Sequence, residues 1–128
     1  MPEPDGIAVP PGTAPLVLHV FPTFAVGGAQ VRFCALANRF GPRWRHVIAS
    51  LDGRTDCAER LRPGVPFTLL PAPVPRGLDP LRAAWRIRGL LRRLRPAVLV
   101  TSNWGSIEWA IANLAPPRIH HLHTEDGF

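Results

Sequence analysis

A pair of glycines after the first apolar run is the feature of this sequence that most directly suggests chemistry. Residues 16–21 are almost entirely apolar, and a glycine pair follows shortly afterwards at the start of a helix-like pattern. A helix that begins on bare backbone presents free N–H groups and a positive dipole end, which suits a phosphate. A ligand could touch the backbone across Gly27, Gly28, Ala29 and Gln30, because the glycines carry no Cβ atom. The pair belongs to neither a GxGxxG nor a GxxxxGK[ST] motif, so a tight turn into the helix is the alternative.

Histidines gather near the end of the sequence, as His120, His121 and His123. If this segment is a strand, His121 and His123 share one face and His120 lies on the other. Their spacing matches no established metal-ligand pattern such as HExxH, so no metal site is predicted. His123 comes at the carboxyl end of the run and is the candidate to donate a hydrogen bond or a proton to a substrate. The alternative is a loop histidine that is satisfied by its neighbours.

Polar residues also follow the last two apolar runs. Asn103 and Trp104 come after residues 97–101, and Glu125 and Asp126 come after the histidines. Asn103 and Trp104 could contact a sugar or a base, or they could cap the next helix and pack into the core. Glu125 and Asp126 could bind a hydroxyl-rich ligand, or they could form an Asx-type turn.

Alternating strand-like and helix-like segments would position these residues. Strands are predicted at residues 16–21, 46–51, 65–70, 97–101 and 118–123, and helices at 29–40, 79–95 and 107–114, with a short helix from residue 56. This alternation predicts an α/β fold, a Rossmann-like doubly wound sheet of about five mostly parallel strands. In strand order 3-2-1-4-5, the loops at 22–30, 102–106 and 124–128 would meet beyond the carboxyl ends of the strands.

Three of the expected helices carry features that a structure can test. In helix 29–40, Val31, Cys34, Ala35, Leu36 and Asn38 recur at three- and four-residue steps, and Cys34 is predicted to be a small core residue. Asp56 and Glu59 have the spacing of a capping box. Asp79 is predicted to cap helix 79–95, with Pro80 at its first position. The apolar stripe of that helix is Ala83, Ile87, Leu90, Leu91 and Leu94.

Length and composition fit one domain with a real core. The chain has 128 residues and is 46% hydrophobic. Residues 1–15 are proline-rich and are predicted to be a flexible leader before a domain at 16–128. No apolar run approaches ~18 residues, so no membrane-spanning helix is predicted. The two cysteines make neither a disulfide framework nor a metal cluster, and they fit a reducing cytoplasm.

The charge is strongly basic, since all fifteen basic residues are arginine and the net charge is +6. Such a balance suggests an acidic partner, although a solvated arginine surface explains it equally well. No known nucleic-acid reader motif is present, and aromatic residues are not interleaved with the arginines along one groove. Nucleic acid is therefore not a predicted partner.

Two runs together carry a resemblance to a known family. Residues 19–30 (HVFPTFAVGGAQ) and 123–128 (HTEDGF) resemble the amino-terminal domain of family 4 retaining glycosyltransferases, which have the GT-B fold. Members open with a strand, a glycine-pair loop followed by Ala and Glu or Gln, and a helix. They also carry a histidine before a small or acidic segment after the fifth strand. The resemblance covers roughly residues 16–128.

This resemblance implies transfer of a sugar from a nucleotide-sugar to an acceptor, in a cleft between two Rossmann-like domains. Gly27 and Gly28 would lie near the donor diphosphate and His123 near the reacting sugar, while the second domain would hold the nucleotide. The implied acceptor-side residues are Asn103, Trp104, Glu125 and Asp126. The nucleotide-sugar is a co-substrate, and neither a metal nor another cofactor is implied. Helix 79–95 could favour an anionic membrane surface, as in family members that act on lipid-linked acceptors, and a solvated helix face is the alternative. The expected location is the cytoplasm, with peripheral contact at the inner face of the membrane if the helix binds lipid.

Sugar transfer needs both walls of such a cleft, because stabilisation of the transition state is shared between them. The resemblance places these 128 residues within the first domain only. A polypeptide of these residues alone is therefore expected to be inactive. The alternative is a stand-alone Rossmann-like module that binds a phosphorylated ligand or a partner subunit without catalysis.

Overall fold

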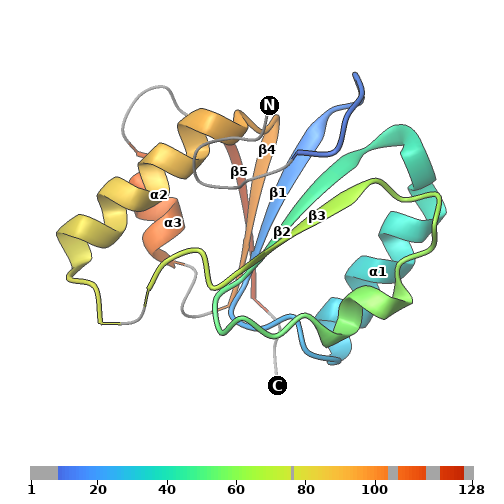
Figure 1. Cartoon of the computed structure of the whole chain (residues 1–128), viewed down its shortest axis with the longest axis horizontal. Coiled ribbons are helices and arrows are strands. Elements are labelled where there is room, and N and C mark those ends of the chain that lie inside the picture. The colour runs from blue at the N-terminus through green and yellow to red at the C-terminus, as the bar shows by residue number, and fades with distance from the viewer. Residues whose placement is uncertain (1–8, 76, 104–106, 115–118, 126–128) are drawn as a thin grey trace.

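A five-stranded parallel sheet runs through the centre of the molecule (Figure 1). The computed structural model describes residues 9–75, 77–103, 107–114 and 119–125. The strands are β1 (Leu16–Phe21), β2 (Arg45–Ser50), β3 (Phe67–Pro71), β4 (Val98–Ser102) and β5 (His120–Thr124). Their order is β3-β2-β1-β4-β5, and every neighbouring pair is parallel. The predicted α/β fold and strand order are confirmed, and the strand bounds shift by one or two residues at some ends.

Helices cover both faces of the sheet. They are α1 (Gly28–Phe40), α2 (Pro80–Leu94) and α3 (Ile107–Ala112), with 3-10 turns η1 (Gly41–Arg43) and η2 (Asp56–Arg60). Figure 1 shows α1 on one side of the sheet and α2 with α3 on the other. Side chains of β1 alternate between the two resulting cores. Leu18 and Val20 pack with α2 and α3, whereas Phe21 packs with α1 and η2.

The structure confirms the predictions for α2. The Asp79 carboxylate accepts a hydrogen bond from the Arg82 amide at 3.0 Å, and Pro80 is the first helical residue. The five residues of the predicted apolar stripe are the buried residues of the helix. Arginines occupy much of the opposite face, so this helix is strongly amphipathic.

The inner face of α1 was predicted only in part. Its buried residues are Gln30, Phe33, Cys34 and Ala37, whereas Ala35 and Leu36 are exposed. Phe33 packs against the rings of Phe21 and Phe24, with centroids 5.6 and 5.9 Å away. Because an aromatic side chain buries more apolar area than alanine or valine, this contact rotates the helix toward Phe33. Asn38 lies at the rim, where its side chain bonds the carbonyl of Arg60 and the amide of Arg62.

The predicted capping box at Asp56 is wrong. The η2 segment is a 3-10 turn preceded by Thr55, and no side chain caps it. Arg54 competes for the carboxylate of Asp56, to which its guanidinium donates at 3.2 Å. One amide that such a cap could use is also engaged, because Ala58 donates to the Thr55 carbonyl at 3.0 Å.

Both cysteines are buried thiols beneath this turn. Their Sγ atoms lie 3.8 Å apart, and the Cys34 Sγ is 3.5 Å from the Cys57 carbonyl. Burial, with the hydrogen bond to Cys57, raises the pKa of the Cys34 thiol to about 12. The predicted core position of Cys34 is therefore confirmed, and the thiol stays protonated at neutral pH.

Residues 9–15, the last part of the segment predicted as a leader, make specific contacts. Arg45 donates through Nε to the Ala14 carbonyl at 2.7 Å and through Nη1 to the Pro10 carbonyl at 2.8 Å. Val9 packs against the core on the α2 side. Residues 1–8 lie outside the described part of the chain.

Candidate functional site

The polar loops meet at the carboxyl ends of the strands. The β1–α1 loop and the β2–η2 loop lie together at one end of the sheet (Figure 1), joined by the bond from the Phe24 amide to the Arg54 carbonyl. At the other side of β1, the Asn103 amide donates to the Thr124 carbonyl at 2.9 Å. Neighbours β1 and β4 lead to helices on opposite faces, so the switch point of the sheet lies between these loops.

The two glycines differ in how closely they are packed. Gly27 precedes α1 with extended backbone, and a Cβ there would approach the Gln30 Oε1 atom to 2.7 Å. Gly28 is the first residue of α1 and is exposed, and a Cβ there would meet no atom within 4 Å. Packing within the described chain therefore explains glycine at 27 but not at 28.

The start of α1 lacks a side-chain cap and a nearby acidic residue in its own first turn. The partial positive charge of the helix end is thus compensated neither by a capping side chain nor by an acidic residue of the first turn. Ala29 lies half-buried in this turn, whereas the Gln30 side chain turns inward and donates from Nε2 to the Thr23 carbonyl at 2.9 Å. Gln30 therefore holds the loop in shape.

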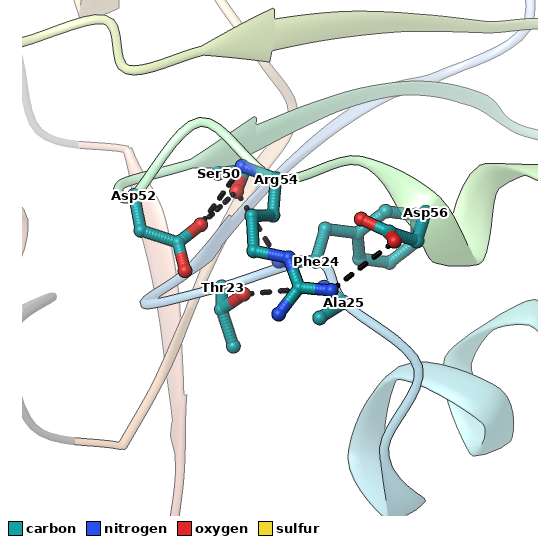
Figure 2. Close-up of polar contacts among 7 residues, drawn as sticks. All are labelled: Thr23, Phe24, Ala25, Ser50, Asp52, Arg54 and Asp56. Carbon is teal, nitrogen blue, oxygen red and sulfur yellow. Dashed lines mark hydrogen bonds and ion pairs between the residues drawn. The ribbon is translucent and has the colours of Figure 1, made fainter.

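A second set of contacts, which the sequence analysis missed, joins the loop after β2 to the loop that leads to the glycine pair (Figure 2). The Ser50 hydroxyl accepts a hydrogen bond from the Phe24 amide at 3.2 Å and donates to Asp52 at 3.1 Å. Asp52 also accepts from the Arg54 amide at 2.9 Å. The Asp52-Gly53 pair is a turn signal, since Gly53 has φ of 84°, but no sequence pattern reveals its pairing with Phe24.

Asp52 is held as a carboxylate by this arrangement. Although desolvation acts to raise its pKa, the hydrogen bonds from Arg54, Thr23 and Ser50 and the Arg54 charge lower the pKa of Asp52 overall. Arg54 turns its guanidinium toward Asp56, at 3.2 Å, as Figure 2 shows. The cluster therefore stabilises the loop that leads into Gly27.

His123 lies in a chain of hydrogen-bonding groups at the end of β5. Its Nδ1 atom is 2.7 Å from the Thr101 hydroxyl, and its Nε2 atom is 2.7 Å from the Glu125 carboxylate. The same Thr101 hydroxyl is 2.7 Å from His121 Nε2. Thr101 is fully buried, whereas the His123 side chain keeps 27% of its surface exposed. The predicted shared face of His121 and His123 is confirmed.

The protons available on these groups set the direction of each hydrogen bond in this series. A carboxylate only accepts, so His123 Nε2 carries a proton, and the Nδ1 atom of a neutral His123 must accept from Thr101. The Thr101 oxygen then accepts from His121 Nε2–H. If His123 also carries a proton at Nδ1, that atom donates to Thr101, and the buried Thr101 hydroxyl can then donate to His121 Nε2, which favours the Nδ1–H tautomer of His121. Burial, helped by the nearby His123, lowers the pKa of His121, so His121 stays neutral through this change.

The remaining predicted site residues are placed as follows. Asn103 has a left-handed backbone, with φ of 58°, a conformation that asparagine tolerates at the end of β4. Glu125 is exposed beside His123. Trp104 and Asp126 lie outside the described residues. In the described ranges, no group of three or more His, Cys, Asp or Glu side chains could hold a metal ion. No helix there is both long and apolar enough to cross a bilayer.

The sheet order, glycine loop and crossover pattern define a Rossmann-like α/β domain. Among known families, the glycosyl transferase 4-like domain matches this sequence over residues 27–128. This match spans most of the chain, which therefore belongs to the glycosyl transferase 4-like domain family and is a transferase-type domain by that membership. Comparison with curated proteins and with solved structures gave no match.

Proposed function

We propose that the chain forms the acceptor-side wall of a sugar-transfer cleft, with its glycine loop beside the diphosphate of a nucleotide-sugar. The observation that carries this proposal is Gly28. Glycine at the first turn of a helix normally lowers stability relative to alanine, and no packing contact or positive φ requires it there. Close approach of a ligand to the backbone accounts for it. The open positive end of α1 suits a ligand with negative charge.

The His123 chain would serve the transfer step. Transfer breaks the bond between the anomeric carbon and the diphosphate oxygen and forms a bond from that carbon to an acceptor hydroxyl oxygen. The proton of that hydroxyl passes to the departing nucleoside diphosphate. His123 could bind the sugar or acceptor through its exposed ring edge, while Thr101 and Glu125 fix the orientation of the ring. Asn103 and Glu125, with Trp104 and Asp126, are the proposed acceptor-side residues. The anionic membrane contact of α2 stays a prediction.

The glycine pair provides a matched test of the donor site. Amide signals of the 128-residue chain can be followed by NMR during titration with UDP-glucose and GDP-mannose. We expect saturable shifts at Gly28 and Ala29. Gly28→Ala should weaken this binding about tenfold or more, because the new methyl group occupies the approach path, while thermal stability stays equal or rises.

Gly27→Ala is the structural counterpart. Its Cβ would displace the Gln30 amide from the Thr23 carbonyl, so we expect a loss of about 1 kcal/mol in the free energy of unfolding. Absence of shifts with every nucleotide-sugar, or equal binding by Gly28→Ala and the unchanged chain, would contradict the donor-site proposal. Binding without turnover is expected, since one wall does not complete the cleft.

A further inference from the structure

A hollow lies between α2 and the segment that follows β3. Its volume is about 690 Å³, within the usual range for small-molecule sites. Its walls include Leu70 and Leu90, which belong to the core on the α2 side, and the Pro71–Pro73 segment. Of the predicted substrate-binding residues that the structure describes, none lines this hollow.

Three residues of α2 line the hollow at four-residue spacing, Trp85, Gly89 and Arg93. The side chains at such spacing lie on one face of a helix. Trp85 is 66% exposed, which is unusual for so large an apolar side chain. Along this wall, the row therefore presents the exposed ring of Trp85, a gap at Gly89, here called the notch, and the guanidinium group of Arg93.

The notch is not explained by packing. Gly89 lies inside α2, where glycine is less favourable than alanine, yet a Cβ there would meet no atom within 4 Å. Its φ is not positive. Space for a ligand ring between Trp85 and Arg93 accounts for a glycine at this position.

The charge of the hollow indicates an anionic group. Arg86 and Arg93 line it, and among the described residues that line it none is acidic. Arg86 is preorganised, because its Nε donates to the Pro73 carbonyl at 2.6 Å and so fixes the guanidinium against the opposite wall. Guanidinium groups bind phosphate oxygens with paired hydrogen bonds.

We infer that this hollow binds a phosphorylated ring compound, with the ring against Trp85 over Gly89 and the phosphate at Arg86 and Arg93. A sugar phosphate has this chemistry, whether it is free or is the headgroup of a phosphoinositide. The inference does not depend on the proposed sugar-transfer function, because no residue of the hollow belongs to the proposed transfer site.

Titration of the 128-residue chain with glucose 1-phosphate tests the inference. We expect saturable NMR shifts in residues 85–93 and 71–73, and much weaker shifts with glucose or inorganic phosphate alone. Gly89→Ala should weaken binding about tenfold while raising the melting temperature, because alanine favours the helix and fills the notch. A purely structural glycine could not produce these opposite effects.

Arg93→Ala and Arg92→Ala form the charge control, since both remove one positive charge from α2 and only Arg93 lines the hollow. We expect about tenfold weaker binding for the first and little change for the second. Vesicles of phosphatidylcholine with and without phosphatidylinositol separate the two sources. Binding of either the free sugar phosphate or the phosphoinositide vesicles, with loss in Gly89→Ala, supports the inference. Binding of neither ligand, or equal effects of the two arginine variants, overturns it.

Discussion

The Thr101 hydroxyl has one proton and contacts two histidine rings, so it can link the tautomer of His121 to the protonation of His123. The geometry favours a change of His121 from the Nε2–H to the Nδ1–H tautomer when His123 gains a proton, because the buried Thr101 hydroxyl then has the His121 ring as its acceptor. Only the run of histidines is visible in the sequence. Thr101 was not predicted, because its role depends on the parallel register that sets it opposite His123.

Thr101→Val removes the hydroxyl that couples the rings. We expect the His121 tautomer to become independent of His123 protonation, as measured by ring ¹⁵N shifts across a pH titration. Thr101→Ser keeps the hydroxyl and should restore the coupling. A tautomer change of the same size in the valine variant would rule out the hydroxyl as the link.

At the scale of elements, the spacing of apolar residues predicts the buried face of one helix but not of the other. In α2 the apolar residues at helical spacing form one stripe, which the sequence alone predicts as the buried face, and Leu81 and Trp85 lie off that stripe and are exposed. In α1 two overlapping sets of positions have helical spacing, and the choice between them is made by Phe21 and Phe24, which come from β1 and its loop. Such partners are set by the tertiary fold, which a local pattern does not contain.

Two aspartates test the element ends directly. Asp79→Ala removes the cap of α2 and should lower the free energy of unfolding by about 1 kcal/mol in urea denaturation. Asp56→Ala should leave it essentially unchanged, because Asp56 caps nothing and its pair with Arg54 is exposed to solvent. Equal losses in the two variants would mean that η2 is capped after all.

For the whole molecule, the alternation of strands and helices in the sequence predicts the order of the strands. It does not predict which polar side chains are buried in the interior. His19 and His46 carry no signal in the sequence. They lie beneath α1, with ring centroids 5.9 Å apart, and the His19 ring is 4.2 Å from the ring of Phe33. Both ring nitrogens of His46 are buried and have no hydrogen-bond partner among the described residues. A neutral ring tolerates such a place better than a charged one does.

This pair makes the whole domain sensitive to mild acid. Burial, with a contribution from His46, lowers the pKa of His19 from 6.5 to about 3, and burial also lowers the pKa of His46. Since the unfolded chain takes up these protons near pH 6.5 and the folded chain does not, stability is full above that pH. The free energy of unfolding falls as the pH drops toward 3. At pH 5, the shifted pKa of His19 alone should lower it by about 2 kcal/mol, and His46 should lower it further.

Urea denaturation at pH 7.5 and pH 5.0 measures this effect, in a window where carboxylates remain ionised. The double variant His19→Leu and His46→Leu should lose most of the pH dependence. His120→Asn, which removes an exposed histidine of β5, should retain it. A chain that is equally stable at both pH values, or one whose pH dependence survives in the double variant, would show that these rings take up protons in the folded state. The aromatic core beneath α1 would then have to admit water, because a charged imidazole there needs a solvation that Phe21 and Phe33 cannot supply.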